Sequence, residues 1–168
     1  TVSACSSSGG GGPTPIEILP TVVFLADKHT DGTDELYASF DAGADIDKLS
    51  GAMTGGGNVV DFRFSPNGLR VAYVADQRTD GVFELFVTTI DGGTPPTTPV
   101  SGTMAGSGIA PDSDNPDRYA FAWSPDSSRV AYRADQDTDE VVELFSVPLD
   151  GSTSSSKLNG PLVAGGRV

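Results

Sequence analysis

The chain has 168 residues, with 10 Lys and Arg against 23 Asp and Glu, and a formal net charge of −13. This charge argues against nucleic acid as a partner, because such binding depends on cationic side chains that neutralise phosphates. It also disfavours adsorption to anionic lipid. The apolar runs are far shorter than the roughly 20 residues of a membrane-spanning helix. With 21 Gly and 12 Pro, we expect one turn-rich domain with a sizeable core.

The N-terminal segment has the features of an anchored tether. The chain has one cysteine, Cys5, so no internal disulfide is possible. Small residues precede it in Val2-Ser3-Ala4-Cys5, which resembles the lipobox of bacterial lipoproteins, and the Ser/Gly run that follows is typical of a flexible tether. We therefore predict a lipobox-like N-terminus and linker over residues 1–20, with lipidation at Cys5. The alternative is a tail that carries an unmodified thiol.

An internal repeat is the strongest signal in the sequence. The run Val-Ala-Tyr-x-Ala-Asp begins at Val71 and again at Val130, and a related run, Val-Val-Phe-Leu-Ala-Asp, begins at Val22. In each case a Thr-Asp turn follows, and then Glu-Leu-Tyr or Glu-Leu-Phe. The run at Val71 begins 49 residues after the run at Val22, and the run at Val130 begins 59 residues after the run at Val71. This self-similarity predicts three structural units of the same kind.

Each unit is expected to be a small antiparallel sheet. The central run of the second unit, residues 71–75, is short and rich in residues that favour strands. Turn signals bound it, with Ser-Pro-Asn-Gly at 65–68 and Thr-Asp-Gly at 79–81. The second unit therefore predicts four strands, at 60–64, 71–75, 85–90 and around 100–101.

The central strands are apolar on both faces. In the second unit Val71, Tyr73 and Ala75 point one way, and Ala72 and Val74 point the other. Such a sheet must be covered on both sides, and copies that cover one another form a β-propeller. A two-sheet sandwich, the alternative all-β layout, would leave one polar face per strand. We therefore expect an all-β fold of β-propeller blades, each a four-stranded antiparallel meander, at about 21–52, 58–102 and 118–160.

The residues around the Ser-Pro turns resemble a known family. Segments 64–73 and 121–132 are similar to the TolB-type, WD-like β-propeller repeat. The resemblance covers roughly residues 20–168 and implies the propeller fold. Members of this family include periplasmic binding and scaffolding proteins, and propeller domains attached to serine peptidases. The resemblance is specific for the fold and unspecific for function.

Two residues of the third unit depart from the repeat. Ser127 replaces the turn glycine seen at Gly68, which is a small change. Arg133 stands where the other units have Leu25 and Val74, which is a larger one, because a buried unpaired charge is costly. We expect either a carboxylate partner for Arg133 or a wetter face on the third unit.

The chain has two full units and one partial unit, because residues 13–20 do not match the Phe-Ser-Pro or Trp-Ser-Pro pattern that marks the first strand of the other units. Three repeats do not close a propeller, which needs about four to eight blades. The sequence 164–168 resembles the lead-in to a new strand at 54–59, so we predict the start of a further strand there. Two explanations are open for this incomplete propeller. The chain is a piece of a longer propeller, or copies complete one another by adding strands, giving a ring or a filament.

Carboxylates surround the hairpin of every unit, and the third adds Asp137 to form an Asp-x-Asp-x-Asp run like the opening of a calcium loop. The full calcium-loop pattern is absent, because Glu140 stands where that loop needs Gly. Two interpretations remain: Ca²⁺ ligands, or turn residues that cap backbone amides, with Arg78 and Lys28 as candidate neutralising groups. The candidate metal ligands are Asp27, Asp31, Glu35, Asp76, Asp80, Glu84, Asp135, Asp137, Asp139 and Glu143.

Catalysis is not expected. The one histidine, His29, lies in a hairpin turn, and Gly106-Ser107-Gly108 fails the nucleophile-elbow pattern because Ala105 precedes it. Trp123 matches Phe64 in the repeat and is expected in the core. An acidic loop at 112–117 is expected to be solvated.

These observations predict a non-catalytic, extracytoplasmic β-propeller protein of the bacterial cell envelope or the extracellular space. We expect it to bind or scaffold protein, with a lipid anchor at Cys5 as its membrane contact and Ca²⁺ as the candidate stabilising ion. One alternative is a self-assembling subunit of a surface layer or filament, completed by strand pairing between subunits. Another is the propeller domain of a larger serine peptidase.

Overall fold

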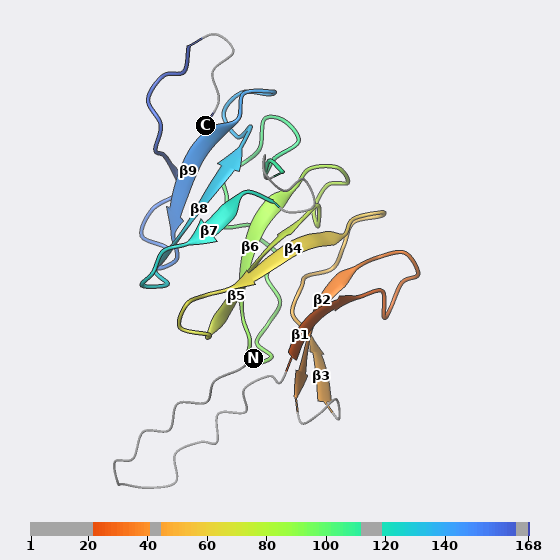
Figure 1. Ribbon diagram of the computed structural model, residues 1–168. Helices are drawn as coiled ribbons and strands as arrows, with labels where there is room; N and C mark the ends of the chain where they lie inside the picture. The colour runs from red at the N-terminus through yellow and green to blue at the C-terminus, as the bar shows by residue number, and fades with distance from the viewer. Residues whose placement is uncertain (1–21, 41–44, 112–118, 164–167) are drawn as a thin grey trace, which may run out of the picture.

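The computed structural model describes residues 22–40, 45–111, 119–163 and 168, and within them the protein is all-β (Figure 1). The described residues form strands and turns with no helix, and so contain none that could cross a membrane. The predicted lipid site at Cys5, the linker 1–20, the acidic loop 112–117 and most of the predicted strand 164–168 lie outside the described residues.

The strands form three antiparallel sheets, one for each sequence repeat (Figure 1). The first sheet has the order β1-β2-β3, with β1 at Val22–Ala26, β2 at Glu35–Phe40 and β3 at Asp45–Lys48. The second has the order β4-β5-β6, with β4 at Val59–Phe64, β5 at Arg70–Ala75 and β6 at Glu84–Thr89. The third has the order β10-β9-β8-β7, with β7 at Phe121–Trp123, β8 at Arg129–Ala134, β9 at Glu143–Pro148 and β10 at Ser156–Lys157.

An aromatic pair lies across the central hairpin of each sheet. The two rings face each other from directly opposite positions of neighbouring strands and are stacked, an arrangement worth about 0.5–1.5 kcal/mol beyond the area it buries. The pairs are Phe24–Tyr37, Tyr73–Phe86 and Tyr132–Phe145, with ring centroids 5.9, 5.2 and 5.7 Å apart.

The second sheet is buried on both faces, as predicted. Its Val71 and Tyr73 belong to a core shared with the first sheet, while Ala72 and Val74, which point the other way, belong to a core shared with the third. All four side chains are fully buried. The second sheet is therefore covered by the first sheet on one face and by the third sheet on the other, as the apolar pattern of β5 requires.

Only the third sheet has the predicted four strands. In the second repeat, the N–H groups of Val100 and Ser101 both donate to Leu85 O, at 2.8 and 3.4 Å, and pairing goes no further. Pro96 and Pro99 both precede Val100, and proline has no N–H to offer a ladder. In the first repeat, β3 takes the outer position, and no strand equivalent to β4 occurs among the described residues.

The inner strand of the third sheet begins at Phe121. The two residues before it also pair with a separate segment. Tyr119 forms a bridge with Pro111, and Ala120 N–H donates to Ala110 O at 2.9 Å.

The structure accounts for one of the two departures from the repeat. Ser127 has φ 61° where Gly68 has φ 72°, and its Oγ accepts a hydrogen bond from Asn67 N–H of the second sheet at 3.1 Å. Ser127 is therefore strained in its backbone, but its side chain gains a hydrogen bond to the second repeat that glycine could not make. Arg133 lies on the face of β8 turned away from the second sheet, half-buried, and its Nε has no partner among the described residues.

Candidate functional site

The predicted glutamates at the hairpins are buried and paired with basic side chains. Each begins the second strand of its hairpin, and each is at most 6% exposed. A buried carboxylate needs such a partner, because desolvation penalises the charged form. The pairs are Glu35–Lys48, Glu84–Arg78 with Nε–Oε2 at 2.9 Å, and Glu143–Lys157 with Nζ–Oε2 at 3.0 Å.

These contacts shift the pKa values of the groups involved. Burial alone would raise the pKa of Glu35, but hydrogen bonds from Lys48 and Tyr37 outweigh it, and the pKa of Glu35 is lowered. The pKa of the Tyr37 hydroxyl is raised by burial and by the same carboxylate. The hydrogen bond to Glu84 raises the pKa of Arg78. The Glu35 carboxylate is therefore stabilised in its charged form by its ion pair with Lys48. Of the two predicted neutralising residues, Arg78 is confirmed, and Lys28 lies instead over the Tyr37 ring.

Two of the predicted aspartates hold the glycine-rich loop that leads out of the preceding repeat. Asp76 accepts N–H bonds from Asn58 at 2.6 Å and from Gly81 at 3.0 Å. Asp135 accepts N–H bonds from Ser107 at 3.0 Å and from Gly108 at 2.6 Å. Ser107 and Gly108 supply successive amides of the loop, which form a concave site for an anion, and here the anion is the Asp135 carboxylate. Asp76 bonds to the loop through Asn58 alone, because Gly81 lies in the hairpin turn that follows Asp76.

The other predicted ligands are exposed. Asp27, Asp31, Asp80 and Asp139 lie in the turns, and Asp137 pairs with Lys157 at 3.0 Å. Across the described ranges, no group of three or more His, Cys, Asp or Glu side chains is arranged to hold a metal ion. The contacts seen for Asp76 and Asp135 are those of the capping interpretation, and Ca²⁺ at the hairpins stays a prediction.

A glycine of each of the first two repeats joins its sheet to the next. Gly51 N–H donates to Gln77 Oε1 at 3.0 Å and reaches Tyr73 OH at 3.4 Å. Tyr73 OH in turn donates to Gln77 Oε1 at 2.9 Å. We call this arrangement, with its counterpart in the third sheet, the glycine contact. In that counterpart, Gly102 N–H donates to Gln136 Oε1 at 3.1 Å and to Tyr132 OH at 3.3 Å.

The glycine contact has no room for a side chain. A Cβ on Gly51 would lie 2.4 Å from Gln77 Nε2 and 2.5 Å from Pro96 O, and one on Gly102 would lie 2.6 Å from the Gln136 amide. Gly160 occupies the same place in the third repeat, and there a Cβ would meet nothing within 4 Å.

The first sheet lacks the acceptor half of this contact. Phe24 and Lys28 stand where the second repeat has Tyr73 and Gln77, so the hydroxyl and the amide oxygen are both missing. Its tyrosine lies on the opposite strand as Tyr37, whose OH donates to Glu35 at 2.6 Å. Sequence reasoning missed the glycine contact, although its signal was present: Asp-Gln follows the central strand in both later repeats.

A second polar contact joins the inner strands of the second and third sheets. Arg63 Nη2 donates to Tyr119 O at 2.8 Å, and its guanidinium lies 4.4 Å from the centre of the Phe121 ring. Trp123 Nε1 donates to Arg63 O at 3.0 Å, so this tryptophan, expected in the core, packs at the core's edge. Asp61 completes the contact by accepting Tyr119 N–H at 3.0 Å.

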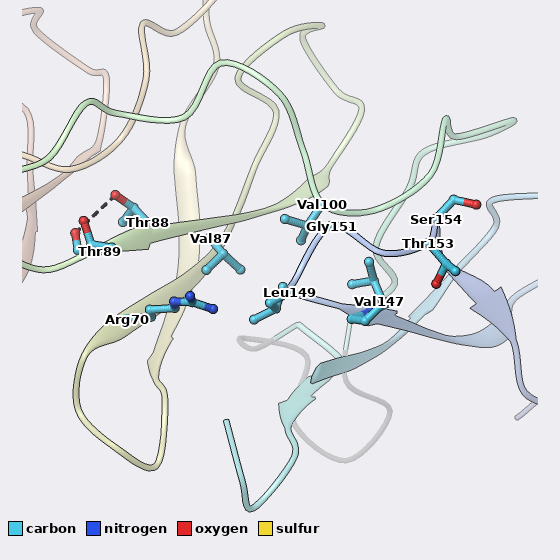
Figure 2. Close-up of a pocket in the computed structure, with 11 residues that line it drawn as sticks. Arg70, Val87, Thr88, Thr89, Val100, Val147, Leu149, Gly151, Thr153 and Ser154 are labelled. Atoms are coloured by element: carbon cyan, nitrogen blue, oxygen red, sulfur yellow. Dashed lines mark hydrogen bonds between the residues drawn. The ribbon is translucent and has the colours of Figure 1, made fainter. Parts of the chain in front are cut away.

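A cavity of about 350 Å³ lies between the second and third sheets, at the ends of β5 and β6 remote from the hairpin (Figure 2). Its apolar wall is formed by Val87, Val100, Val147 and Leu149, and Arg70 lies at its edge. No sequence pattern indicated this cavity, because it depends on how two sheets meet.

His29 lies in the first hairpin turn, as predicted. Its imidazole is largely exposed, and Nδ1 lies 2.6 Å from Tyr37 OH. Ser107 Oγ, in the segment that fails the nucleophile-elbow pattern, lies 3.3 Å from Asp135 Oδ2. Neither a protein-family model nor a curated protein matches the sequence.

Proposed function

We propose that the chain is a set of β-propeller blades in a non-catalytic protein that binds or scaffolds other proteins in the cell envelope or outside the cell. The observation that carries this proposal is the glycine contact, which repeats with the same donors and acceptors between both pairs of neighbouring sheets. A radially repeated fold needs such a contact, because each unit must meet the next in the same way.

The surface available to a partner is acidic. The exposed hairpin tips carry Asp31, Asp80, Asp139 and Glu140, while the glutamates behind them are already paired. Exposed charge of one sign steers association with a surface of the opposite sign. We therefore propose a protein partner with a basic surface, engaged through the hairpin tips.

The test compares capture of partners from an envelope extract by the wild-type chain and by the triple variant Asp31→Asn, Asp80→Asn, Asp139→Asn. These side chains are exposed, so the variant is expected to keep its fold, which circular dichroism would verify. The wild type should retain a partner that elutes with rising salt, and the variant should retain much less. Equal retention by the two proteins would reject the hairpin tips as the binding surface.

The location and the lipid anchor are tested by the intact mass of the native protein. Lipidation at Cys5 adds the mass of acyl chains, and a Cys5→Ser variant should lose both that mass and its recovery in the membrane fraction. A native polypeptide much heavier than 17.2 kDa would indicate further blades in the same chain. An unmodified Cys5 in the native protein would remove the anchor from the proposal.

Calcium stabilisation is part of the same proposal and has its own measurement. Binding to the folded state alone stabilises it by mass action. The melting temperature with Ca²⁺ should therefore exceed that with a chelator by several degrees. Identical melting curves would leave the hairpin carboxylates with the capping role seen for Asp76 and Asp135.

A second candidate function, self-assembly, is favoured by the open surroundings of Gly160. Leu158 beside it is 54% exposed, so this end of the third repeat is open to a further sheet. If copies assemble there, a side chain at position 160 should clash as it would at Gly51 and Gly102. Gly160→Val should then convert an assembled wild type to monomers without loss of stability. A wild type that elutes as a 17.2 kDa monomer at all concentrations would reject self-assembly.

A further inference from the structure

The cavity between the second and third sheets exists because one residue of the repeat is small where its counterpart is large. Phe40 is the last residue of β2, and Thr89 is the last residue of β6. The Phe40 side chain is only 6% exposed, in the core where the first two sheets meet, together with Ile90. Thr89 is exposed and lines the cavity instead, as does Leu149, which takes the place of Ile90 in the third repeat. The space that an aromatic ring fills at the first interface is therefore open at the second.

A cationic side chain reaches into this space. Arg70 lies directly opposite Thr89 across the β5–β6 ladder, and in Figure 2 its guanidinium extends between Val87 and Leu149. Its side chain makes no hydrogen bond or ion pair with any residue of the described ranges. By contrast, Arg63 and Arg78 are both engaged with other residues. An arginine beside an apolar wall is a site for a carboxylate, which it can bind through two parallel N–H bonds.

Two acids lie close to this end of the cavity, and each has its own partners. Asp91 accepts a hydrogen bond from the Thr89 hydroxyl at 2.5 Å. Asp150 lines an adjoining hollow of about 260 Å³ together with Arg70 and Arg129. Its carboxylate accepts Ser152 N–H at 2.9 Å, and this loop lowers the pKa of Asp150, with Arg129 adding to the effect. The Asp150 charge is thus held by its own turn and offset by Arg129, which leaves the Arg70 guanidinium open to an added anion.

We propose that this cavity binds a molecule that carries an aromatic ring close to a carboxylate. The ring would occupy the position that Phe40 fills at the first interface, against Val87, Val147 and Leu149, and the carboxylate would meet Arg70. A volume of about 350 Å³ falls within the range of small-molecule sites, which are mostly apolar with a few placed polar groups. This chemistry belongs to a free aromatic acid or to a polypeptide that ends in phenylalanine. The inference does not depend on the proposed function, since it requires only the second interface.

The first experiment is a titration of methyl-labelled protein with N-acetyl-L-phenylalanine, followed by NMR. We expect saturable shifts at the methyl groups of Val87, Val147 and Leu149, with little change at Val23 in the first sheet. The matched probe is N-acetyl-L-phenylalanine amide, which keeps the ring and lacks the charge. It should bind at least about tenfold more weakly, because a hydrogen bond to a charged group is lost. Equal binding of acid and amide would overturn the role of Arg70.

Two variants test the two halves of the site. Arg70→Gln should weaken binding of the acid by about tenfold or more, whereas Lys28→Gln, which makes the same change in net charge at an exposed position of the first sheet, should leave it unchanged. Thr89→Phe should abolish binding and raise the melting temperature by a few degrees, because the new ring fills the cavity as Phe40 fills its own. Undiminished binding by Thr89→Phe would place the ligand elsewhere and overturn the proposal.

The two sources of the ligand are separated by one further comparison. A short peptide that ends in phenylalanine is titrated beside N-acetyl-L-phenylalanine. Tighter binding of the peptide would assign the cavity to a chain end, and tighter binding of the single residue would assign it to a free acid. If neither probe shifts the cavity methyl groups at millimolar concentration, the proposal fails.

Discussion

The two interfaces between sheets are built from the same repeat, yet they differ in what fills them. The first is closed by the Phe40 ring, and no inner strand of the first sheet contributes to it among the described residues. The second adds the Arg63 contact between inner strands and leaves a cavity beside Thr89. The glycine contact is common to both. Each interface also has its own apolar core and a loop amide bonded to an aspartate of the next repeat. This comparison teaches that the shared contacts place neighbouring sheets, while the side chains at the end of the interface are free to vary.

The largest effect is expected at the glycine contact itself. Gly51→Val and Gly102→Val should each lower the free energy of unfolding by about 3 kcal/mol, because a side chain there overlaps the glutamine and breaks its hydrogen bonds. Gly160→Val is the matched control, since the space around Gly160 is open, and should change stability by less than about 0.5 kcal/mol. Urea unfolding measures all three. A similar loss of stability for Gly160→Val would mean that the backbone at this place in the repeat requires glycine, and that crowding by the next sheet is not the cause.

The Arg63 contact should matter only at the second interface. Arg63→Met removes the bonds to Tyr119 and to Phe121, and leaves the Asp61 carboxylate without its arginine partner. We expect a loss of about 2 kcal/mol, with faster amide exchange confined to the third sheet. Arg70→Met serves as the control, because the Arg70 side chain makes no hydrogen bond or ion pair with any residue of the described ranges. Faster exchange throughout the first sheet would show that the two interfaces are coupled more tightly than their separate contacts suggest.

The Glu35 pair in the first sheet predicts a dependence of stability on pH. The pKa of Glu35 is lowered in the folded state, because its bonds to Lys48 and Tyr37 outweigh its burial. Its contribution is therefore present above its unfolded value of 4.5 and is lost as the pH falls through the folded value. Glu35→Gln should cost about 1–2 kcal/mol near neutral pH, and the gap from wild type should narrow below pH 4.5. A gap that is constant with pH would contradict this assignment.

The smallest effect is expected at the third hairpin turn. Glu140 has φ 62°, where Gly32 and Gly81 have φ 74° and 76° in the equivalent turns. A residue with a side chain is strained in this region, so Glu140→Gly should stabilise the protein by up to about 1 kcal/mol. Gly81→Ala is the reverse change and should destabilise it by a similar amount. Thermal unfolding distinguishes the two, and a loss of stability in Glu140→Gly would show that its side chain has a role at the turn.

The repeat pattern predicted the sheets and their stacking, because both depend on local alternation. Val71 to Ala75 are apolar on both faces, and that pattern alone requires a cover on each side. The strand count was wrong where proline removed donors, near Val100. That outcome follows from Pro96 and Pro99 once the lack of an N–H is taken into account.

The hairpin carboxylates show where sequence reasoning reaches its limit. Charge and spacing identified Glu84 together with its partner Arg78 in the same hairpin. They did not identify the partner of Asp76, because the loop at Asn58 belongs to another segment. The cavity beside Thr89 was beyond prediction for a similar reason. Its wall includes Val147 and Leu149 of another repeat, and a void depends on side-chain sizes from both sheets at once.

The glycine contact and the aspartate-held loops are directional in a way that bears on how the protein comes apart. In both, the earlier repeat supplies backbone amides and the later repeat supplies side-chain acceptors. Detaching the third sheet would strip the partners from the amides of Gly102, Ser107 and Gly108. Detaching the first would free the side chains of Tyr73 and Gln77 and the Val59 amide, which donates to Asp34 O. Solvent deuterium should thus enter the tail of the second repeat, at Gly102, Ser107 and Gly108, as soon as the third repeat frays.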